Sequence, residues 1–227
     1  MIIGIISDAH GNIYGLKKCF ALLRKKGAEE TFFLGDALNY FSKSKEVLDF
    51  LKAEKIKCIK GNHESILLEE RHVSPEEEKI CSLNLTKQAL NEENLAFIKS
   101  WQESMELEID NCKMLMVHAS PFNHLEEYIY PDSDLSKFLY LRQEVVFLAH
   151  THIPFIRKIE DKTIVNVGSV GFSRVEGKSI YCATFDTSKR QARILTTDFP
   201  LQNLRELEPF DEALNKVLQR GQMKEAA

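Results

Sequence analysis

The sequence predicts an α/β fold, and three observations lead to this prediction. Over the first 63 residues, short apolar runs alternate with longer segments of helical periodicity, in the order β-α-β-α-β. After a charged, helical middle, the residues from 155 to about 196 are rich in strands. The chain also has 227 residues, of which 44% are hydrophobic and 28% charged, a composition typical of a soluble globular protein. The opening alternation favours a mostly parallel sheet with right-handed crossovers.

The elements of the first half follow from apolar runs and their end signals. Residues 1–7 form a continuous apolar run, which is typical of a buried strand. Asn12 can cap a helix that runs to about Lys26 with Leu16 on its apolar face, and Gly27 can end it. The next predicted elements are a strand at 31–34, a helix at 43–53 and a strand at 56–59.

The second half is predicted with fewer regular signals. Residues 64–103 are helical and charged, with a break at Ser74-Pro75 and a further cap at Asn91. A hairpin is expected to turn at Asp110-Asn111, although the glycine usual in such turns is missing. The remaining predictions are a helix at 133–141, a strand at 145–148, later turns at 160–161, Gly177 and Ser188, and an amphipathic helix at about 211–220.

Several broad classes of protein are disfavoured by composition. The net charge of −4 and the lack of a long basic run argue against stable nucleic-acid binding. The first apolar run is too short for a membrane span and lacks a signal-peptide pattern, so a cytoplasmic location without a membrane partner is expected. Five scattered cysteines without a CxxC pair suggest reduced thiols.

The chain is expected to form a single domain over residues 1–227, because neither an internal repeat nor a low-complexity linker is found. The predicted terminal helix carries an apolar stripe that includes Phe210 and Leu214. This stripe either packs on the domain or forms a contact in a homo-oligomer, and the sequence leaves both open.

Side chains that can bind a metal follow one predicted strand after another. The carboxyl ends of strands in an α/β sheet line one crevice, where ligands bind. These side chains, although far apart in the sequence, are therefore expected to converge. They are Asp8, His10, Asp36, Asn62, His63, His118, His150 and His152.

Five of the seven histidines belong to this set. A lone histidine at a strand end is commonly a hydrogen-bonded structural residue, but five beside carboxylates indicate bound cations, which keep imidazole neutral and carboxylate ionised. Nitrogen and oxygen donors without thiolate suit manganese first, and also iron, zinc, cobalt or nickel. Seven of these eight side chains acting as ligands would be too many for one tetrahedral zinc, but they suit two ions that share a bridging carboxylate.

In chain order, the polar segments are Ser7-Asp8-Ala9-His10-Gly11-Asn12, Gly35-Asp36, Gly61-Asn62-His63-Glu64, Val117-His118, His150-Thr151-His152 and Asn166-Val167-Gly168-Ser169. This ordered set over residues 7–169 resembles the motifs of calcineurin-like metallophosphoesterases. It is most similar to the small prokaryotic phosphodiesterase branch of that superfamily. The resemblance implies a four-layer αββα sandwich, in which two mixed β-sheets lie face to face and are flanked by helices.

The resemblance also implies a role for each residue of the set. One metal would be held by Asp8, His10 and His152, and the other by Asn62, His118 and His150. Asp36 would bridge the two ions. His63 would stand outside the ligands and either contact a phosphate oxygen or protonate the leaving alkoxide, with Glu64 orienting or tuning it. The expected chemistry is attack of a metal-activated hydroxide on phosphorus, with Asn62 helping to stabilise the transition state.

Substrate contacts are predicted with less support. Arg174 follows the last motif at a spacing shared with many relatives and would either bind phosphate bidentately or form a solvent-facing salt bridge. Four aromatic side chains lie in loops after strand ends and would either stack on a base or pack beneath the loops. These residues are Tyr40, Phe122, His124 and Tyr128.

Two positions depart from the family pattern. Ala149 stands where a glycine usually precedes the last pair of histidines, and Ala119 where a glycine often follows the earlier one. Each adds a methyl group near the backbone, so the loops or the metal spacing are expected to differ slightly. No ligand position is lost.

Several functions remain open from the sequence. Hydrolysis of small phosphodiesters, including cyclic nucleotides, comes first. Hydrolysis of dinucleoside polyphosphates or of phosphomonoesters, including phosphoproteins, comes next. A non-catalytic protein-binding scaffold on the same fold is an alternative of another class, and the intact His63 argues against it. A further alternative is an α/β binding domain whose histidines are structural, for which purified protein would hold no metal.

Overall fold

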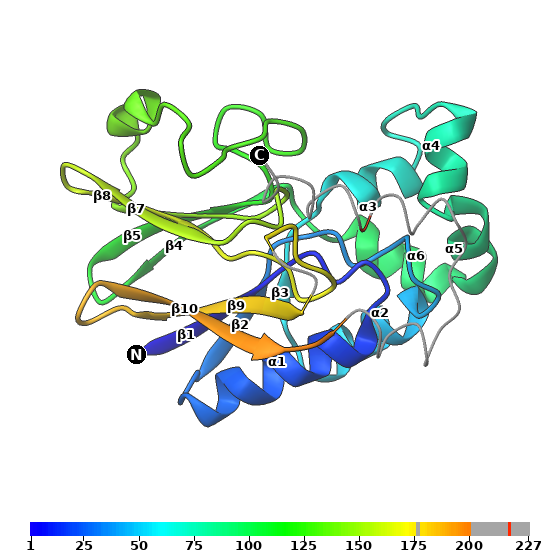
Figure 1. Ribbon diagram of the computed structural model, residues 1–227, viewed down its shortest axis with the longest axis horizontal. Coiled ribbons are helices and arrows are strands. Elements are labelled where there is room, and N and C mark those ends of the chain that lie inside the picture. Colours follow the sequence, from blue (N-terminus) through cyan, green and yellow to red (C-terminus); the bar gives the residue numbers. More distant parts are fainter. Residues whose placement is uncertain (176–177, 201–217, 219–227) are drawn as a thin grey trace.

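Two five-stranded β-sheets lie face to face in the computed structural model, which describes residues 1–175, 178–200 and 218 (Figure 1). The first sheet contains β1 (Ile2–Ile6), β2 (Glu30–Phe33), β3 (Lys57–Cys58), β9 (Ser179–Asp186) and β10 (Gln191–Asp198), in the spatial order β10-β9-β1-β2-β3. The second contains β4 (Ser104–Ile109), β5 (Cys112–Val117), β6 (Val145–Leu148), β7 (Phe155–Ile159) and β8 (Lys162–Asn166), in the order β4-β5-β6-β8-β7.

Both sheets mix parallel and antiparallel pairs. In the first, β1, β2 and β3 are parallel, as the opening alternation predicts, whereas β9 joins β1 antiparallel. In the second, β6 pairs in parallel with β5 and β8. The third strand is shorter than predicted: β3 ends at Cys58, and Ile59 then forms a lone parallel bridge with Gln102. Parallel strands bring their carboxyl ends to one edge, and this edge positions the candidate site.

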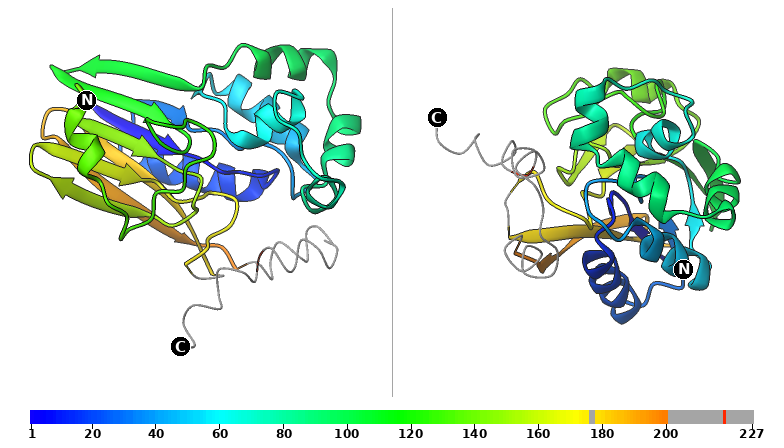
Figure 2. Two further views of the ribbon diagram at one scale, coloured as in Figure 1. Left: turned by 90° about the horizontal axis from the view of Figure 1, so that it is seen from above. Right: turned by 90° about the vertical axis from the view of Figure 1, so that its right-hand side faces the viewer.

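Helices α1 (Ile13–Lys25) and α2 (Ser44–Ala53) cover the outer face of the first sheet (Figure 1). The side chain of Asn12 accepts the N–H of Gly15 at 2.9 Å, which confirms the predicted cap. Four short helices follow, namely α3 (Asn62–Leu67), α4 (Pro75–Ile80), α5 (Leu83–Ala89) and α6 (Glu92–Lys99). They gather at one end of the molecule (Figure 2). The predicted break at Ser74-Pro75 is where Ser74 caps the start of α4, and the predicted cap Asn91 begins α6.

The predicted hairpin joins β4 to β5, and its two turn residues adopt left-handed conformations without glycine. Asp110 has φ +51° and Asn111 has φ +57°, as a type I′ turn requires. The predicted helix at 133–141 is present as the shorter 3-10 helix η1 (Ser136–Tyr140). Asp134 accepts both the N–H and the hydroxyl of Ser136, and such local bonds compete with α-helical pairing.

Three apolar layers separate four structural layers. The first lies between α1, α2 and the first sheet, and includes Leu16 and Phe33. The second fills the space between the sheets, where Phe32 and Phe147 are buried. The third lies over the outer face of the second sheet and includes Phe138 of η1. The predicted αββα sandwich is thus confirmed, with an outer layer over the second sheet formed mainly by loops.

Some predictions fall outside the described residues. These are the turn at Gly177 and the helix at 211–220, of which only Leu218 is described. The single domain over the whole chain stays a prediction. Among the described residues, no helix combines the length and the apolar character that crossing a membrane requires.

Candidate metal centre

The loops that follow the strands carry an unusual concentration of left-handed backbone. Half of the fourteen described non-glycine residues with positive φ lie here: Asp8, His10, Asp36, Asn39, Tyr40, His150 and His152. This conformation costs energy for residues with a Cβ atom and persists only where the surroundings impose it. Here the loops hold one another, since the N–H of Asp8 donates to the Gly35 carbonyl and that of His10 to the Asp36 carbonyl.

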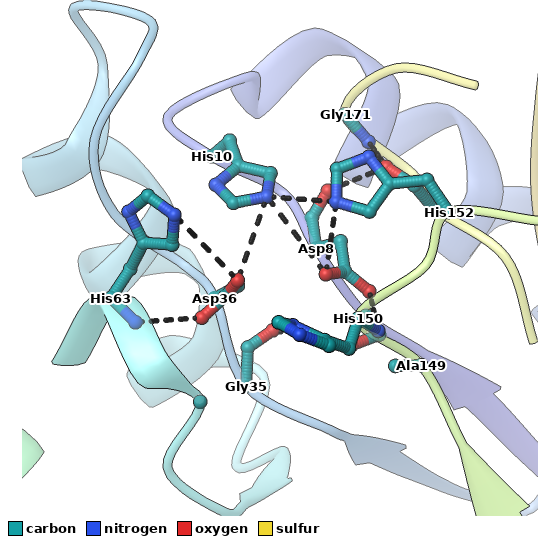
Figure 3. A network of polar contacts seen from close by, with 12 residues as sticks. Asp8, His10, Gly35, Asp36, His63, Ala149, His150, His152 and Gly171 are labelled. Atoms are coloured by element: carbon teal, nitrogen blue, oxygen red, sulfur yellow. Dashed lines mark hydrogen bonds and ion pairs between the residues drawn. The ribbon is translucent and has the colours of Figure 1, made fainter. Parts of the chain in front are cut away.

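The predicted ligands meet at one place. The ligands form three overlapping groups. Within each group the ligand atoms lie within 4.8 Å of one another, and every member is buried. The groups are Asp8, His10 and His152; His10, Asp36 and His63; and Asp36, His118 and His150. Figure 3 shows the Asp36 carboxylate between the rings of His63 and His10. Asp36 belongs to two groups, which is the position expected of a bridging ligand.

One side of the centre is formed by Asp8, His10 and His152. The Nε2 atoms of the two histidines are 3.1 Å apart. Asp8 Oδ1 lies 3.2 Å from Nε2 of His152 and 3.8 Å from Nε2 of His10. Asp36 Oδ2 is 3.7 Å from the same His10 nitrogen. Four donor atoms thus face a common point.

The other side is formed by His118, Asn62 and His150. His118 Nε2 lies 3.0 Å from Asn62 Oδ1 and 3.2 Å from His150 Nδ1. Asp36 Oδ2 is 3.3 Å from the same His118 nitrogen. The two sides therefore share the Asp36 carboxylate.

Backbone carbonyls orient three of the histidine rings. Each of these rings directs Nδ1 to a carbonyl oxygen, so Nδ1 carries the proton and the Nε2 lone pair faces the centre. The carbonyls are those of Leu38 for His10 (3.2 Å), Leu34 for His118 (2.7 Å) and Phe172 for His152 (3.1 Å). This arrangement is the usual support of a metal-ligating histidine.

Burial and mutual charge shift the pKa values of the centre in opposite directions. Burial lowers the pKa of His10 well below its ordinary value, and burial together with His118 lowers that of His150 to about 2. Burial also opposes the charges of Asp36 and His118, but each stabilises the other. Their attraction raises the pKa of His118 to about 9 and holds that of Asp36 well below its usual range.

The donor set fits a pair of cations on structural grounds. Asp8 Oδ1 and His150 Nε2 are buried and have no hydrogen-bond partner among the described residues. The lone pairs on Nε2 of His10 and His152 point at each other across 3.1 Å and repel unless a positive charge lies between them. Burial keeps His10 from supplying that charge by protonation. Imidazole, carboxylate and amide donors suit the divalent ions expected from the sequence.

The Glu64 carboxylate contacts backbone groups and not the His63 ring, so the predicted orienting or tuning of His63 stays a prediction. The carboxylate accepts the backbone N–H groups of Gly61 (2.7 Å), Asp36 (2.8 Å) and Ala37 (2.8 Å). Burial raises the pKa of Glu64 to about 7, against these three donors, which favour the ionised form. The side chain that is hydrogen-bonded to the His63 ring is that of Asn39, whose Nδ2 lies 2.8 Å from His63 Nδ1. Sequence reasoning missed Asn39 because it does not directly follow a strand.

A cavity of about 280 Å³ opens over the centre. Its walls include His63, Tyr40, Arg174 and Arg71. A smaller cavity of about 200 Å³ adjoins it and shares Asn62, Arg71, Tyr128 and His150 with the larger one. Tyr40 and Arg174 therefore lie where a substrate contact was predicted.

Arg71 was not predicted, because it lies in the charged segment between predicted strands, where its residue type is common. The Arg71 guanidinium is held by Glu126, with Nε 2.7 Å from Oε1. This ion pair joins the segment before α4 to the loop after β5. It places a positive charge where the two cavities meet.

His124 and Phe122 do not line either cavity. His124 faces Glu103, with Nδ1 3.6 Å from Oε2, so its predicted contact with substrate is not supported by its placement. Phe122 packs edge-on against Phe138 of η1, with ring centroids 5.4 Å apart. Tyr128 does reach the centre, where its ring lies 4.1 Å from that of His150. Ala119 and Ala149 are buried, and the histidines beside them, His118 and His150, belong to one ligand group.

Comparison with known proteins gives the same architecture. A family model described as the calcineurin-like phosphoesterase superfamily domain matches residues 1–190. An uncharacterized protein of Methanocaldococcus jannaschii is 28% identical over 221 residues, which cover 88% of this chain and 89% of the relative.

Two solved structures share the fold over nearly the full length. One is a hypothetical protein from Pyrococcus horikoshii, with a TM-score of 0.81, 18% identity, and coverage of 96% of this chain and 97% of the other. The other is a metallophosphoesterase from Sphaerobacter thermophilus, with a TM-score of 0.78, 23% identity, and coverage of 97% and 100%. At these identities the likeness concerns the fold.

Proposed function

The chain belongs to the calcineurin-like phosphoesterase superfamily, and from this premise we propose that it is a metal-dependent phosphodiesterase. The observation that carries the proposal is the Asp36 carboxylate, which two ligand groups share at the base of a two-part cavity. The proposed substrates are small phosphodiesters or nucleotides.

In this proposal, Asp8, His10 and His152 would hold one divalent cation, manganese first, and Asn62, His118 and His150 would hold a second, with Asp36 shared between them. Cations held there would supply an activated water nucleophile and neutralise the charge that grows on the phosphate oxygens. The facing ring nitrogens of His10 and His152, and Asp8 Oδ1, which has no hydrogen-bond partner among the described residues, support this assignment.

The shape of the cavity favours a diester over a monoester. A phosphodiester carries two organic substituents on its phosphorus, whereas a monoester carries one. The larger and smaller cavities meet at Asn62 and His150, so a phosphate at the centre has room for one substituent on each side.

Two arginines extend positive charge beyond the metal ligands. Arg174 lines the larger cavity, and its Nε is buried without a hydrogen-bond partner among the described residues. Such a guanidinium can donate hydrogen bonds to a bound anion. Arg71 is already paired with Glu126, which fixes it at the junction of the cavities. A substrate with a second anionic group, such as a nucleotide, would use Arg174.

Hydrolysis of a diester adds water across one P–O bond, and the leaving oxygen must be stabilised as that bond breaks. His63 is outside the proposed ligands and lies beside the shared carboxylate, with Nε2 4.0 Å from Asp36 Oδ2. Its role is either to contact a phosphate oxygen or to protonate the leaving oxygen. In both roles, removing the ring slows the reaction.

The experiment that tests the proposal combines metal binding with turnover. Chelator-treated protein is titrated with manganese by calorimetry and then assayed on bis(4-nitrophenyl) phosphate, 4-nitrophenyl phosphate and a dinucleoside polyphosphate. We expect two ions per chain and the highest kcat/KM on the diester. His63→Ala is expected to lose most of the rate, and Asp36→Asn to lose bound metal as well as activity.

The possible results separate the alternative functions. Higher activity on the monoester or the polyphosphate would replace the phosphodiesterase assignment while leaving the metal centre intact. Full activity of Asp36→Asn would contradict the shared bridge. Metal binding without any turnover would favour a scaffold, and the absence of metal binding would favour structural histidines.

A further inference from the structure

Three contacts hold His63 in place, one through its backbone and two through its ring. Its backbone N–H donates to Asp36 Oδ1 at 2.9 Å. The ring packs against His10, with centroids 4.7 Å apart, and against Tyr40 at 5.0 Å. These contacts position the ring, but they do not determine which ring nitrogen carries the proton. That choice depends on the partner of Nδ1.

The partner of Nδ1 is the side chain of Asn39, which the local backbone directs at the ring. Asn39 has φ +70°, a left-handed conformation that asparagine tolerates better than most residues. Its N–H donates to Ser44 Oγ at 3.1 Å, which anchors the turn at the start of α2. The Asn39 side chain is fully buried, and its Nδ2 lies 2.8 Å from His63 Nδ1. Within the described residues, this is the one hydrogen bond that the side chain makes.

Asn39 turns Nδ2 to the ring and leaves Oδ1 buried without a hydrogen-bond partner among the described residues, and with this amide orientation the polarity of the hydrogen bond sets the tautomer. An amide nitrogen donates and cannot accept, so the ring nitrogen that faces it must be the acceptor. Nδ1 of His63 is therefore without a proton, and the single ring proton lies on Nε2. Because His63 lines the larger cavity and Nδ1 is turned to the buried Asn39, the Nε2–H group is the one presented to the centre.

We propose that Asn39 is a positioning residue that fixes His63 in the Nε2–H tautomer, so that His63 acts as a hydrogen-bond donor to a phosphate oxygen and not as a general acid. A ring whose Nδ1 is unprotonated would become an anion if it gave up the Nε2 proton. It can instead donate a hydrogen bond that strengthens as charge develops on the oxygen. No bond to hydrogen is broken, and the departing alkoxide takes its proton from solvent.

This inference rests on the proposed function for the role of His63, but not for its tautomer. The tautomer is measured in metal-free protein by the ¹⁵N shifts of the histidine ring, with His63→Ala used to assign the signals. We expect a pyridine-type Nδ1 and a pyrrole-type Nε2. Asn39→Asp should invert this pattern, because a carboxylate accepts and requires a proton on Nδ1. A pyrrole-type Nδ1 in the wild-type protein would overturn the proposal.

The role is tested in the metal-loaded enzyme with a series of aryl and alkyl phosphodiesters. A general acid assists poor leaving groups most, whereas a hydrogen bond to a phosphate oxygen assists all of them similarly. His63→Ala should therefore lose rate on the order of 10²-fold across the whole series. His63→Gln, which keeps a donor amide but cannot transfer a proton, should recover at least tenfold of this loss. A loss confined to poor leaving groups would contradict the role.

The variant Asn39→Gly separates positioning from stability, because glycine accepts φ +70° without strain. We expect it to lower kcat and to have no further effect in a His63→Ala background, since Asn39 acts through His63. Additive losses in the double variant would contradict this. Asn111→Gly is the matched control, because Asn111 has φ +57° in an exposed turn outside the site. If no phosphoester is hydrolysed, the proposed function fails while the ¹⁵N result still decides the tautomer.

Discussion

At the scale of single residues, one buried carboxylate joins the loops that carry the centre. Glu64 lies at the start of α3 and accepts backbone N–H groups from Gly61, Asp36 and Ala37. The first is a contact within its own helix terminus, and the other two cross to the loop after β2. Glu64 therefore determines how close Asp36 lies to Asn62.

We expect Glu64→Ala to destabilise the protein strongly. The substitution leaves three buried N–H groups without an acceptor, at a cost of roughly 1–3 kcal/mol for each unsatisfied group before relaxation. A loss of about 3–5 kcal/mol in the free energy of unfolding is expected, measured by urea denaturation of the chelated protein. The control is Glu76→Ala, at an exposed position of α4, which should change stability by less than about 0.5 kcal/mol. A loss below about 1 kcal/mol for Glu64→Ala would contradict this role.

At the scale of elements, the start of helix α1 packs closely against the loop that follows β8. Asn12 caps the helix and also donates from Nδ2 to the Gly171 carbonyl at 2.7 Å. Ser169 Oγ and the Gly171 N–H both donate to the Asp8 carbonyl. The loop can approach this closely because α1 has no side chain at Gly15, where a Cβ atom would lie 2.1 Å from the Val170 carbonyl oxygen.

We expect Gly15→Ala to destabilise the protein, although it raises helix propensity. In an exposed helix the same change would gain about 1 kcal/mol. Here the added methyl group meets a rigid backbone carbonyl, and overpacking of this kind costs about 1–3 kcal/mol. Thermal or urea unfolding measures the difference. The control is Ala21→Gly, at an exposed position of the same helix, with an expected loss of about 0.5–1 kcal/mol. A gain for Gly15→Ala would contradict the close packing.

At the scale of the whole molecule, the two sheets are joined at an edge by Asp110. This residue lies in the hairpin turn of the second sheet. Its carboxylate accepts hydrogen bonds from Thr187 and Ser188, which lie at the turn between β9 and β10. It also accepts one from the amino group of Met1, just before β1, at 3.3 Å. The hydrogen bond from Thr187 is the main cause that lowers the pKa of Asp110, and Ser188 adds to it.

This lowered pKa predicts how stability depends on pH. A carboxyl group with a folded-state pKa below its unfolded value, about 3.9, stabilises the fold above that value. The contribution is lost as pH falls through the folded-state pKa. Asp110→Asn should therefore lower the urea midpoint at pH 7, and the difference from wild type should shrink below pH 4. Asp132→Asn, in an exposed loop, is the control. A difference that stays constant between pH 7 and pH 3 would contradict the link.

The sequence by itself determined the features that depend on neighbours in the chain. Apolar periodicity located most strands, and cap residues such as Asn12 and Asn91 located helix starts. The residues directly after the strands identified every side chain that now lies in the three ligand groups, because parallel strands bring their ends to one edge. The helix predicted at 133–141 is shorter, at 136–140, and of the 3-10 type, because the side-chain hydrogen bonds of Asp134 shape its start.

Only the tertiary structure decided which side chains touch across the loops. Asn39 reaches His63 over 24 positions, and Glu64 reaches Asp36 over 28, whereas His124 turns away to Glu103. These contacts depend on left-handed residues that direct each loop, and no periodic pattern encodes that direction. The physical reason is the separation along the sequence between the interacting groups. A strand or a helix cap is recognised from residues a few positions away, whereas the partner of a loop side chain depends on how distant segments pack.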